Sequence, residues 1–287
     1  MILFKGLSAR NFIFILITLI AKLTLNAQDI LVTTKTITLG LDTVQLIIHE
    51  KKGEQIVYIH VHENETASLE AGLDVLNKYG GKLVTLKHTF DGTTNRFVTF
   101  RYNNSTYQFD PNRIYTTNDS LLQSKISVVD GIGKVNEKVK KIVKNLASEI
   151  WEEVSFYPLI VALHNNKNTS PEIRNIWFFW EKYEPESYNI TSYIKKGDYS
   201  SDTNKSASDI YINTEINNSE FFIVTERQDF ISFYNKRFSV VLQSENPVDD
   251  GSMSVFAAGN QKRYINAEAK HGKVEEQKAM LELLHQH

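Results

Sequence analysis

The pattern of apolar and polar positions predicts alternating strands and helices. Segments 30–40 and 43–51 alternate partly in hydrophobicity, so we expect two short strands joined by a Gly-Leu-Asp turn. Residues 54–61, EQIVYIHV, are mostly apolar, as is typical of a strand buried on both faces. In 64–81, leucines recur at helical spacing before two glycines, and 82–88 again favours a strand. This order predicts a parallel crossover unit.

The remaining segments continue the alternation. Residues 96–110 predict a hairpin around two asparagines, and 134–154 predict a long amphipathic helix. The apolar run 159–163 resembles another buried strand, whereas 165–207 has no sustained period and is expected to form long loops. Segments from 209 to 284 restore strands and helices. We therefore expect a single α/β domain with a mixed, mostly parallel twisted β-sheet and helices on both faces.

The first residues have the layout of a secretory signal peptide, with a basic start and an apolar core over 12–21. A membrane helix needs roughly 20 apolar residues, and Lys22 interrupts this run after about ten, so a retained anchor is the weaker alternative. We expect a signal peptide over 1–27 and an exported protein, periplasmic or secreted. The mature domain would cover 28–287, with no stable membrane span after cleavage.

Charge and composition exclude several classes of function. The chain has a formal net charge of −2, and removal of residues 1–27, which contain three basic and no acidic residues, leaves −5. A nucleic-acid partner needs a basic face, which neither this balance nor a local cluster supplies. The absence of cysteine excludes thiolate ligands, so any metal must be bound by nitrogen and oxygen.

Two predicted strands end in residues that can bind a metal. His62 and Glu65 follow the strand at 54–61, and His164 ends the run at 159–163. Two imidazoles and one carboxylate, with a position left open for water, form a catalytic zinc set. Each motif alone is also compatible with a surface turn or a hydrogen-bonded histidine.

We expect that two neighbouring residues, Glu63 and His60, do not bind the metal. Glu63 is spaced to point away from His62, into solvent, although it is an alternative ligand to Glu65. His60 lies on the same face of the strand as His62, and we expect it to pack nearby rather than coordinate.

Four motifs in order resemble the zinc carboxypeptidases of the carboxypeptidase A type. The motifs are HENETAS at 62–68, FDPNR at 109–113, ALHNN at 162–166 and RYINAEAKHG at 263–272. HENETAS is similar to the His-Gly-Asn-Glu-Thr-Ala-Pro signature of the succinylglutamate desuccinylase and aspartoacylase group. FDPNR resembles the superfamily's Asp-Leu-Asn-Arg. Together the motifs span most of the mature chain.

The resemblance implies a role for each matching residue. One zinc ion per chain would be held by His62, Glu65 and His164, and Glu268 would be the general base. A substrate carboxylate would be bound by Asn112 and Arg113. Arg101 would assist the scissile carbonyl, and Tyr193 would close over the substrate. A planar guanidinium suits the carboxylate because it donates two parallel hydrogen bonds.

Several of these assignments have rivals. Arg96 competes with Arg101, Tyr199 with Tyr193, and Glu245 is a weaker candidate for the base than Glu268. Arg113 could instead form a structural ion pair with Asp110.

Three residues differ from the family's motifs at positions where they leave the substrate in doubt. Glu63 replaces a glycine, Ser68 stands where proline is frequent, and Pro111 takes the usual leucine position. The predicted function is an exported zinc-dependent amide hydrolase, carboxypeptidase-like, acting on peptides or peptide-like substrates with a free carboxylate. The alternatives are an N-acyl amino acid deacylase, a non-catalytic carboxylate-binding protein on the same scaffold, and a structural envelope protein. Oligomeric state is left open.

Overall fold

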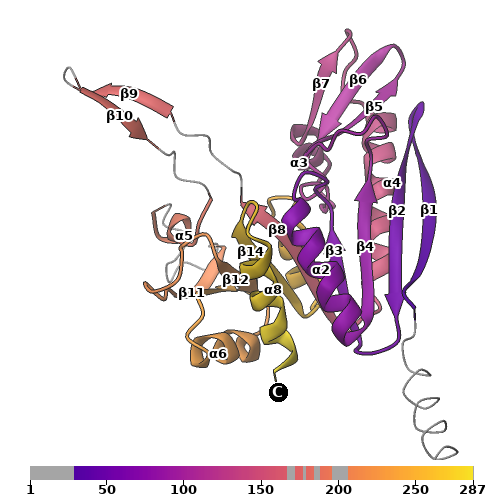
Figure 1. The fold of residues 1–287 in the computed structure, drawn as a ribbon. Coiled ribbons are helices and arrows are strands. Elements are labelled where there is room, and N and C mark those ends of the chain that lie inside the picture. Colours follow the sequence, from indigo (N-terminus) through magenta and orange to yellow (C-terminus); the bar gives the residue numbers. More distant parts are fainter. Residues whose placement is uncertain (1–28, 167–171, 177–178, 184–187, 196–205, 287) are drawn as a thin grey trace, which may run out of the picture.

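A computed structural model gives the fold of most of the chain (Figure 1). It describes residues 29–166, 172–176, 179–183, 188–195 and 206–286. The signal peptide predicted over 1–27 and the candidate Tyr199 lie outside these ranges. In the described part of the chain, no helix is long and apolar enough to cross a membrane.

A nine-stranded mixed sheet forms the centre of the fold. In spatial order its strands are β1 (Leu31–Leu39), β2 (Asp42–Lys51), β4 (Gly81–Lys87), β3 (Ile56–His60), β8 (Leu159–Asn166), β14 (Tyr264–Lys270), β12 (Phe221–Val224), β13 (Val240–Gln243) and β11 (Ala207–Tyr211). The four strands β4, β3, β8 and β14 run parallel to one another. The predicted crossover unit is confirmed, because β3 and β4 are parallel neighbours joined by α2 (Thr66–Tyr79).

The expectation of a mostly parallel sheet is wrong. Four of the eight pairings in this sheet are antiparallel. They are β1 with β2 and β2 with β4 at one side of the sheet, and β14 with β12 and β13 with β11 at the other. Two smaller sheets add only antiparallel pairs: β5 (Val98–Tyr102), β6 (Ser105–Phe109) and β7 (Ile126–Asp130), and β9 (Glu172–Ile176) with β10 (Phe179–Tyr183). Only β1 and β2 form a hairpin with a short turn, whereas the other antiparallel pairs of the large sheet join strands that are separated along the chain by further strands and helices.

Helices cover both faces of the large sheet, as the pattern predicts. On one face α4 (Glu137–Val154) and α7 (Met253–Gly259) pack on inward residues such as Val57 and Ile160. On the other, α2, α6 (Arg227–Asn235) and α8 (Val274–Glu282) pack on residues such as Tyr58 and Val161. Alternate residues of a strand face opposite sides, so each apolar strand supplies both cores.

The remaining elements are short. They are α3 (Asp119–Ser124), α5 (Thr191–Lys195) and the 3₁₀ helix η1 (Leu283–His285). The β9–β10 pair and α5 occupy part of 165–207, where long loops are expected from the sequence. The hairpin predicted at 96–110 forms as β5 and β6, with Asn103 and Asn104 at positive φ in its turn.

Candidate metal centre

The candidate site lies at the carboxyl ends of the parallel strands β3, β8 and β14. His62 and Glu65 follow β3, and His164 lies in β8. The Glu65 N–H donates to His62 O over 2.9 Å, a tight turn that aims both side chains at one point. The three residues are 0%, 1% and 4% exposed, and one ligand atom from each lies within 4.8 Å of the others. The predicted convergence of these three residues is therefore confirmed.

The Glu65 carboxylate bridges the two imidazoles. Oε1 lies 3.0 Å from His62 Nδ1, and Oε2 lies 3.1 Å from His164 Nδ1. Burial raises the pKa of Glu65, but the charges of His62 and His164 outweigh it and hold that pKa well below its ordinary value. The carboxylate is therefore ionised at neutral pH and available as a ligand.

The outer nitrogens of both rings are also held. His62 Nε2 lies 2.7 Å from Asp110 Oδ1, and His164 Nε2 lies 3.4 Å from the Asn112 side-chain amide. Burial lowers the pKa of His62, but the charge of Glu65 and the hydrogen bond with Asp110 outweigh it and raise the pKa to about 9. A carboxylate on the outer nitrogen of a metal-binding histidine orients the ring and raises its basicity.

The residues present fit a divalent cation. His62 Nδ1 is buried without a hydrogen-bond partner, although it faces the Glu65 carboxylate. Buried polar atoms are normally satisfied, so an unpaired nitrogen close to ligand atoms of Glu65 and His164 is compatible with a cation at this place. Two imidazole nitrogens and one carboxylate oxygen could coordinate a metal ion. Asp110 and Asn112 would hold the two imidazole rings in place through their outer nitrogens.

Glu268 lies beside this cluster, on β14. It is directly opposite His164 in the parallel pairing of β14 with β8, and its side chain is buried. The Asn266 amide donates to Glu268 Oε1 over 3.0 Å. Burial raises the pKa of Glu268, with a smaller contribution from Glu65, while His164 and Asn266 lower it. Its rival Glu245 is exposed in the loop after β13.

The arginine at the cluster is Arg96, not Arg101. Arg96 donates to Glu65 Oε1 over 2.7 Å and to Asp110 Oδ2 over 3.2 Å. Arg101 lies on the outward face of β5, where its exposed guanidinium binds Asp42. Alternation along β5 turns Phe100 inward and therefore Arg101 outward.

Glu63 is buried, contrary to the expectation that it points into solvent. Its carboxylate accepts hydrogen bonds from the backbone N–H groups of His88, at 2.8 Å, and Thr89, at 3.1 Å, and from the Thr89 hydroxyl. These bonds anchor the start of the segment that leads from β4 to Arg96. His60 packs nearby, as expected, with Nε2 3.1 Å from Glu65 O.

Asn112 and Arg113 lie in the turn after β6. The Asp110 side chain accepts from Asn112 N over 2.8 Å, and Asp110 O accepts from Arg113 N over 2.9 Å. The Arg113 guanidinium donates to Asp250, not to Asp110. Sequence reasoning missed Asp250 because nothing in its turn-rich context marks it.

Two tyrosine hydroxyls meet near the site. Tyr188 and Tyr193 hydroxyl oxygens are 2.6 Å apart. Burial raises the pKa of both hydroxyls, and the charges of Glu268 and Arg113 act on both. The rings of Tyr188 and Tyr193 both contact Phe221, which lies opposite Glu268 in the pairing of β12 with β14, so both tyrosines lie near Glu268. Tyr188 is an additional candidate that sequence reasoning missed.

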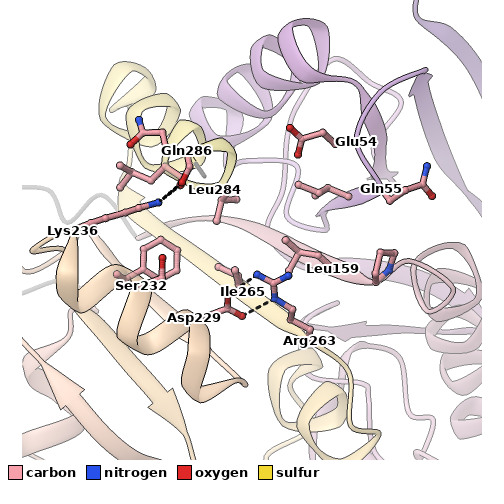
Figure 2. Close-up of a pocket in the computed structure, with 14 residues that line it drawn as sticks. Glu54, Gln55, Leu159, Asp229, Ser232, Lys236, Arg263, Ile265, Leu284 and Gln286 are labelled. Atoms are coloured by element: carbon pink, nitrogen blue, oxygen red, sulfur yellow. Dashed lines mark hydrogen bonds and ion pairs between the residues drawn. The ribbon is translucent and has the colours of Figure 1, made fainter.

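A separate pocket lies at the opposite, amino-terminal ends of the same strands. Its volume is about 270 Å³, and its lining includes Leu159 and Ile265, near the starts of β8 and β14. Figure 2 shows Arg263 paired with Asp229, at 2.6 Å, and Lys236 bonded to Gln286 O, at 3.1 Å. Glu54, which also lines the pocket, lies 2.9 Å from His285 Nδ1. We therefore place the candidate site at the cluster of His62, Glu65 and His164.

Comparisons with known proteins found no match, either among protein-family models or among curated proteins.

Proposed function

We propose that the protein is a zinc-dependent amide-bond hydrolase, carboxypeptidase-like, that acts on peptides or peptide-like substrates with a free carboxylate. The observation that carries the proposal is the buried convergence of His62, Glu65 and His164 next to Glu268. The resemblance of four motifs to zinc carboxypeptidases agrees with this set. A zinc carboxypeptidase-like fold and export from the cell belong to the same proposal.

His62, Glu65 and His164 would hold the zinc ion, since this borderline-soft cation accepts both nitrogen and oxygen donors. When bound, zinc lowers the pKa of a water ligand toward ~7 and polarises a carbonyl group. Asp110 would keep His62 oriented through its outer nitrogen.

Glu268 would act as the general base and then as the general acid. Its raised pKa brings the carboxyl group nearer to neutral pH, where it can both accept and release a proton. It would accept a proton from the attacking water and donate a proton to the leaving amine nitrogen. Asn266 would hold Glu268 through the bond to Oε1.

Arg96 would stabilise negative charge that develops on the carbonyl oxygen, because it is the arginine that reaches the cluster. Arg113, with Asn112 beside it, would bind the substrate carboxylate. Tyr193, or its partner Tyr188, would cover the substrate.

Another candidate is an N-acyl amino acid deacylase, favoured by the resemblance of residues 62–68 to the succinylglutamate desuccinylase and aspartoacylase group. A third is a carboxylate-binding protein without turnover. In that case Asn112 and Arg113 would bind a carboxylate ligand that is not cleaved.

The decisive experiment combines metal analysis with a substrate screen. We expect about one zinc per purified chain and hydrolysis of C-terminal peptides or N-acyl amino acids. Glu268→Gln should abolish hydrolysis and retain zinc, which separates the base from the ligands. A chain that takes up no divalent metal ion would refute the proposal, and full activity of the variant would remove Glu268 from the mechanism.

A further inference from the structure

Two buried side-chain amides adjoin the metal-binding cluster, and the proposed mechanism gives neither of them a role. Asn165 follows His164 near the end of β8, and Gln277 lies on the C-terminal helix α8. Both side chains are buried, and Asn165 Nδ2 donates to Gln277 Oε1 over 3.0 Å. The helices α2 and α8 pack side by side on this face of the sheet (Figure 1). The amide pair therefore connects α8 with the region where α2 begins.

Asn165 contacts the proposed zinc ligand Glu65 directly. The Asn165 backbone N–H donates to Glu65 Oε2 over 3.0 Å. The same carboxylate faces both imidazoles of the cluster. Because Asn165 directly follows His164 in β8, a displacement of its backbone would move two of the three proposed ligands.

Asn165 also caps α2 in place of Glu65. Glu65 occupies the N-cap position of α2, where a side-chain oxygen ordinarily accepts from an N–H group of the first turn. Its carboxylate faces the imidazoles instead, and the Ser68 N–H of that turn donates to Asn165 Oδ1 over 2.8 Å. The helix is thus capped from a neighbouring strand, which leaves the Glu65 carboxylate available to a cation.

Gln277 fixes the orientation of the Asn165 amide. A side-chain amide accepts through its oxygen and donates through its nitrogen, so Oδ1 can face α2 only while Nδ2 has an acceptor on the other side. Gln277 Oε1 is that acceptor, and Gln277 Nε2 donates to Ala267 O over 3.1 Å. Ala267 directly precedes Glu268 in β14. One buried amide therefore contacts the residue after His164 and the residue before the proposed base.

Loss of the Gln277 amide would disturb the cap of α2. Asn165 Nδ2 would lose its acceptor in a buried place, and buried polar groups rarely stay unpaired, so the Asn165 amide would turn toward another partner. The Ser68 N–H would then lose its acceptor as well. The nearest substitute is the side chain at the N-cap position itself, which is Glu65. Its carboxylate would then be shared between α2 and the cation.

Resting on the proposed function, we propose that Gln277 is a positioning residue of the zinc centre. It holds Asn165 in the orientation that caps α2, and this keeps the Glu65 carboxylate available as a zinc ligand. The C-terminal helix thereby contributes to the metal site, with Gln277 acting through Asn165.

The test measures zinc affinity by competition with a chromophoric chelator. Gln277→Met removes the amide and keeps the length of the side chain, and we expect zinc affinity to fall about tenfold, as for other residues that hold a ligand in place. Gln243→Met is the matched control, because Gln243 is also buried and its amide donates to Ser206 O over 2.9 Å, on β13. It should lose stability in denaturant unfolding and keep the native zinc affinity. Native affinity in Gln277→Met, or equal losses of affinity in both variants, would overturn the inference.

A double-mutant cycle tests whether Gln277 acts through Asn165. Asn165→Ala removes the cap, keeps the backbone N–H that bonds to Glu65, and should lower zinc affinity at least as much as Gln277→Met. The double variant should bind zinc within about twofold of Asn165→Ala, because Gln277 then has no side chain left to orient. Additive losses would refute this route.

The native chain offers a test that does not depend on the folding of a variant. The side-chain amide signals of Asn165 and Gln277 in NMR spectra should shift when zinc is added, because hydrogen bonds connect both residues with Glu65. The side-chain amide signal of Gln243 should stay in place. Unchanged signals of Asn165 and Gln277 in the zinc-loaded protein would overturn the inference even if the variants unfold.

Turnover is scored separately from zinc binding. A zinc-binding protein that shows the Gln277 effect but hydrolyses neither C-terminal peptides nor N-acyl amino acids would support the positioning role and refute the proposed hydrolase. Hydrolysis by the native protein, together with native zinc affinity in Gln277→Met, would support the hydrolase and refute the positioning role. A native chain that takes up no zinc would refute both.

Discussion

His62 Nδ1 faces Glu65 Oε1 at 3.0 Å, and the nitrogen has no hydrogen-bond partner although both residues are buried. A cation bound between these atoms would satisfy the nitrogen and the carboxylate together. Zinc should therefore stabilise the folded state by mass action, by about 2.7 kcal/mol at a free concentration 100 times Kd. Thermal unfolding with added zinc and with a chelator measures the effect. His164→Ala should show a much smaller shift, and an equal shift would place the metal elsewhere.

The affinity for zinc should rise with pH. In the metal-free chain the pKa of His62 is about 9, so zinc must displace a proton from this residue at neutral pH. Below pH 9 the apparent affinity should increase by about tenfold per pH unit from this group alone. Calorimetry in buffers of different ionisation enthalpy would detect the released proton. Affinity that does not change between pH 6 and 8 would contradict the prediction.

Because of the same raised pKa of His62, the stability of the metal-free protein should fall as pH rises. Protonated His62 is favoured in the folded state, so its contribution is fully present below the ordinary histidine pKa of ~6.5 and is lost as pH rises through about 9. Asp110→Asn removes one cause of the raised pKa and should reduce this loss. Denaturant unfolding of both proteins at pH 6 and pH 9.5 measures the difference.

The sequence alone predicts the metal-binding set because the fold follows a simple rule there. His62, Glu65 and His164 follow or end strands that run parallel, and the carboxyl ends of parallel strands meet at one edge. The choice between Arg96 and Arg101 could not be made in the same way. Arg96 reaches the cluster from an irregular segment, whereas Arg101 is turned outward by its position in β5.

The partners of Glu63 and Arg113 were also beyond sequence reasoning. The burial of Glu63 depends on two backbone N–H groups 25 and 26 residues away, and Asp250 meets Arg113 across 137 residues. Neither contact has a local pattern. Apart from the turn-linked strands β1 and β2, the antiparallel pairings at the sides of the sheet were missed for a related reason, since hydrophobicity reveals a strand but not the direction of its neighbour.

Arg96 and Arg101 provide a matched pair of substitutions. Arg96→Ala removes the guanidinium that contacts Glu65 and Asp110, and we expect kcat/KM to fall by about 100-fold, as for the loss of one donor to a developing charge. Arg101→Ala removes an exposed pair with Asp42 and should leave kcat/KM within about twofold. Steady-state kinetics decide the assignment, and the reverse order of effects would restore Arg101 to the site.

Glu63 should stabilise the fold without binding the metal. Glu63→Ala leaves the partly buried N–H groups of His88 and Thr89 without this acceptor, at a cost of up to about 1–3 kcal/mol each. Glu70→Ala is the control, because Glu70 is exposed on α2 and its replacement should change stability by less than about 0.5 kcal/mol. Denaturant unfolding measures both. Zinc stoichiometry should remain unchanged in both variants, and loss of zinc in Glu63→Ala would make Glu63 part of the site.

Asn266 should control the pH at which Glu268 becomes active. Its amide donates to Glu268 Oε1 over 3.0 Å, which favours the ionised carboxylate and lowers its pKa. Asn266→Ala removes this bond, so the pKa of Glu268 should rise and the acidic limb of the kcat/KM profile should move to higher pH. A merely structural defect would lower kcat/KM at every pH without moving that limb. Asn266→Gln, which keeps an amide donor, should restore part of the native profile, and a limb that stays in place in Asn266→Ala would exclude this role.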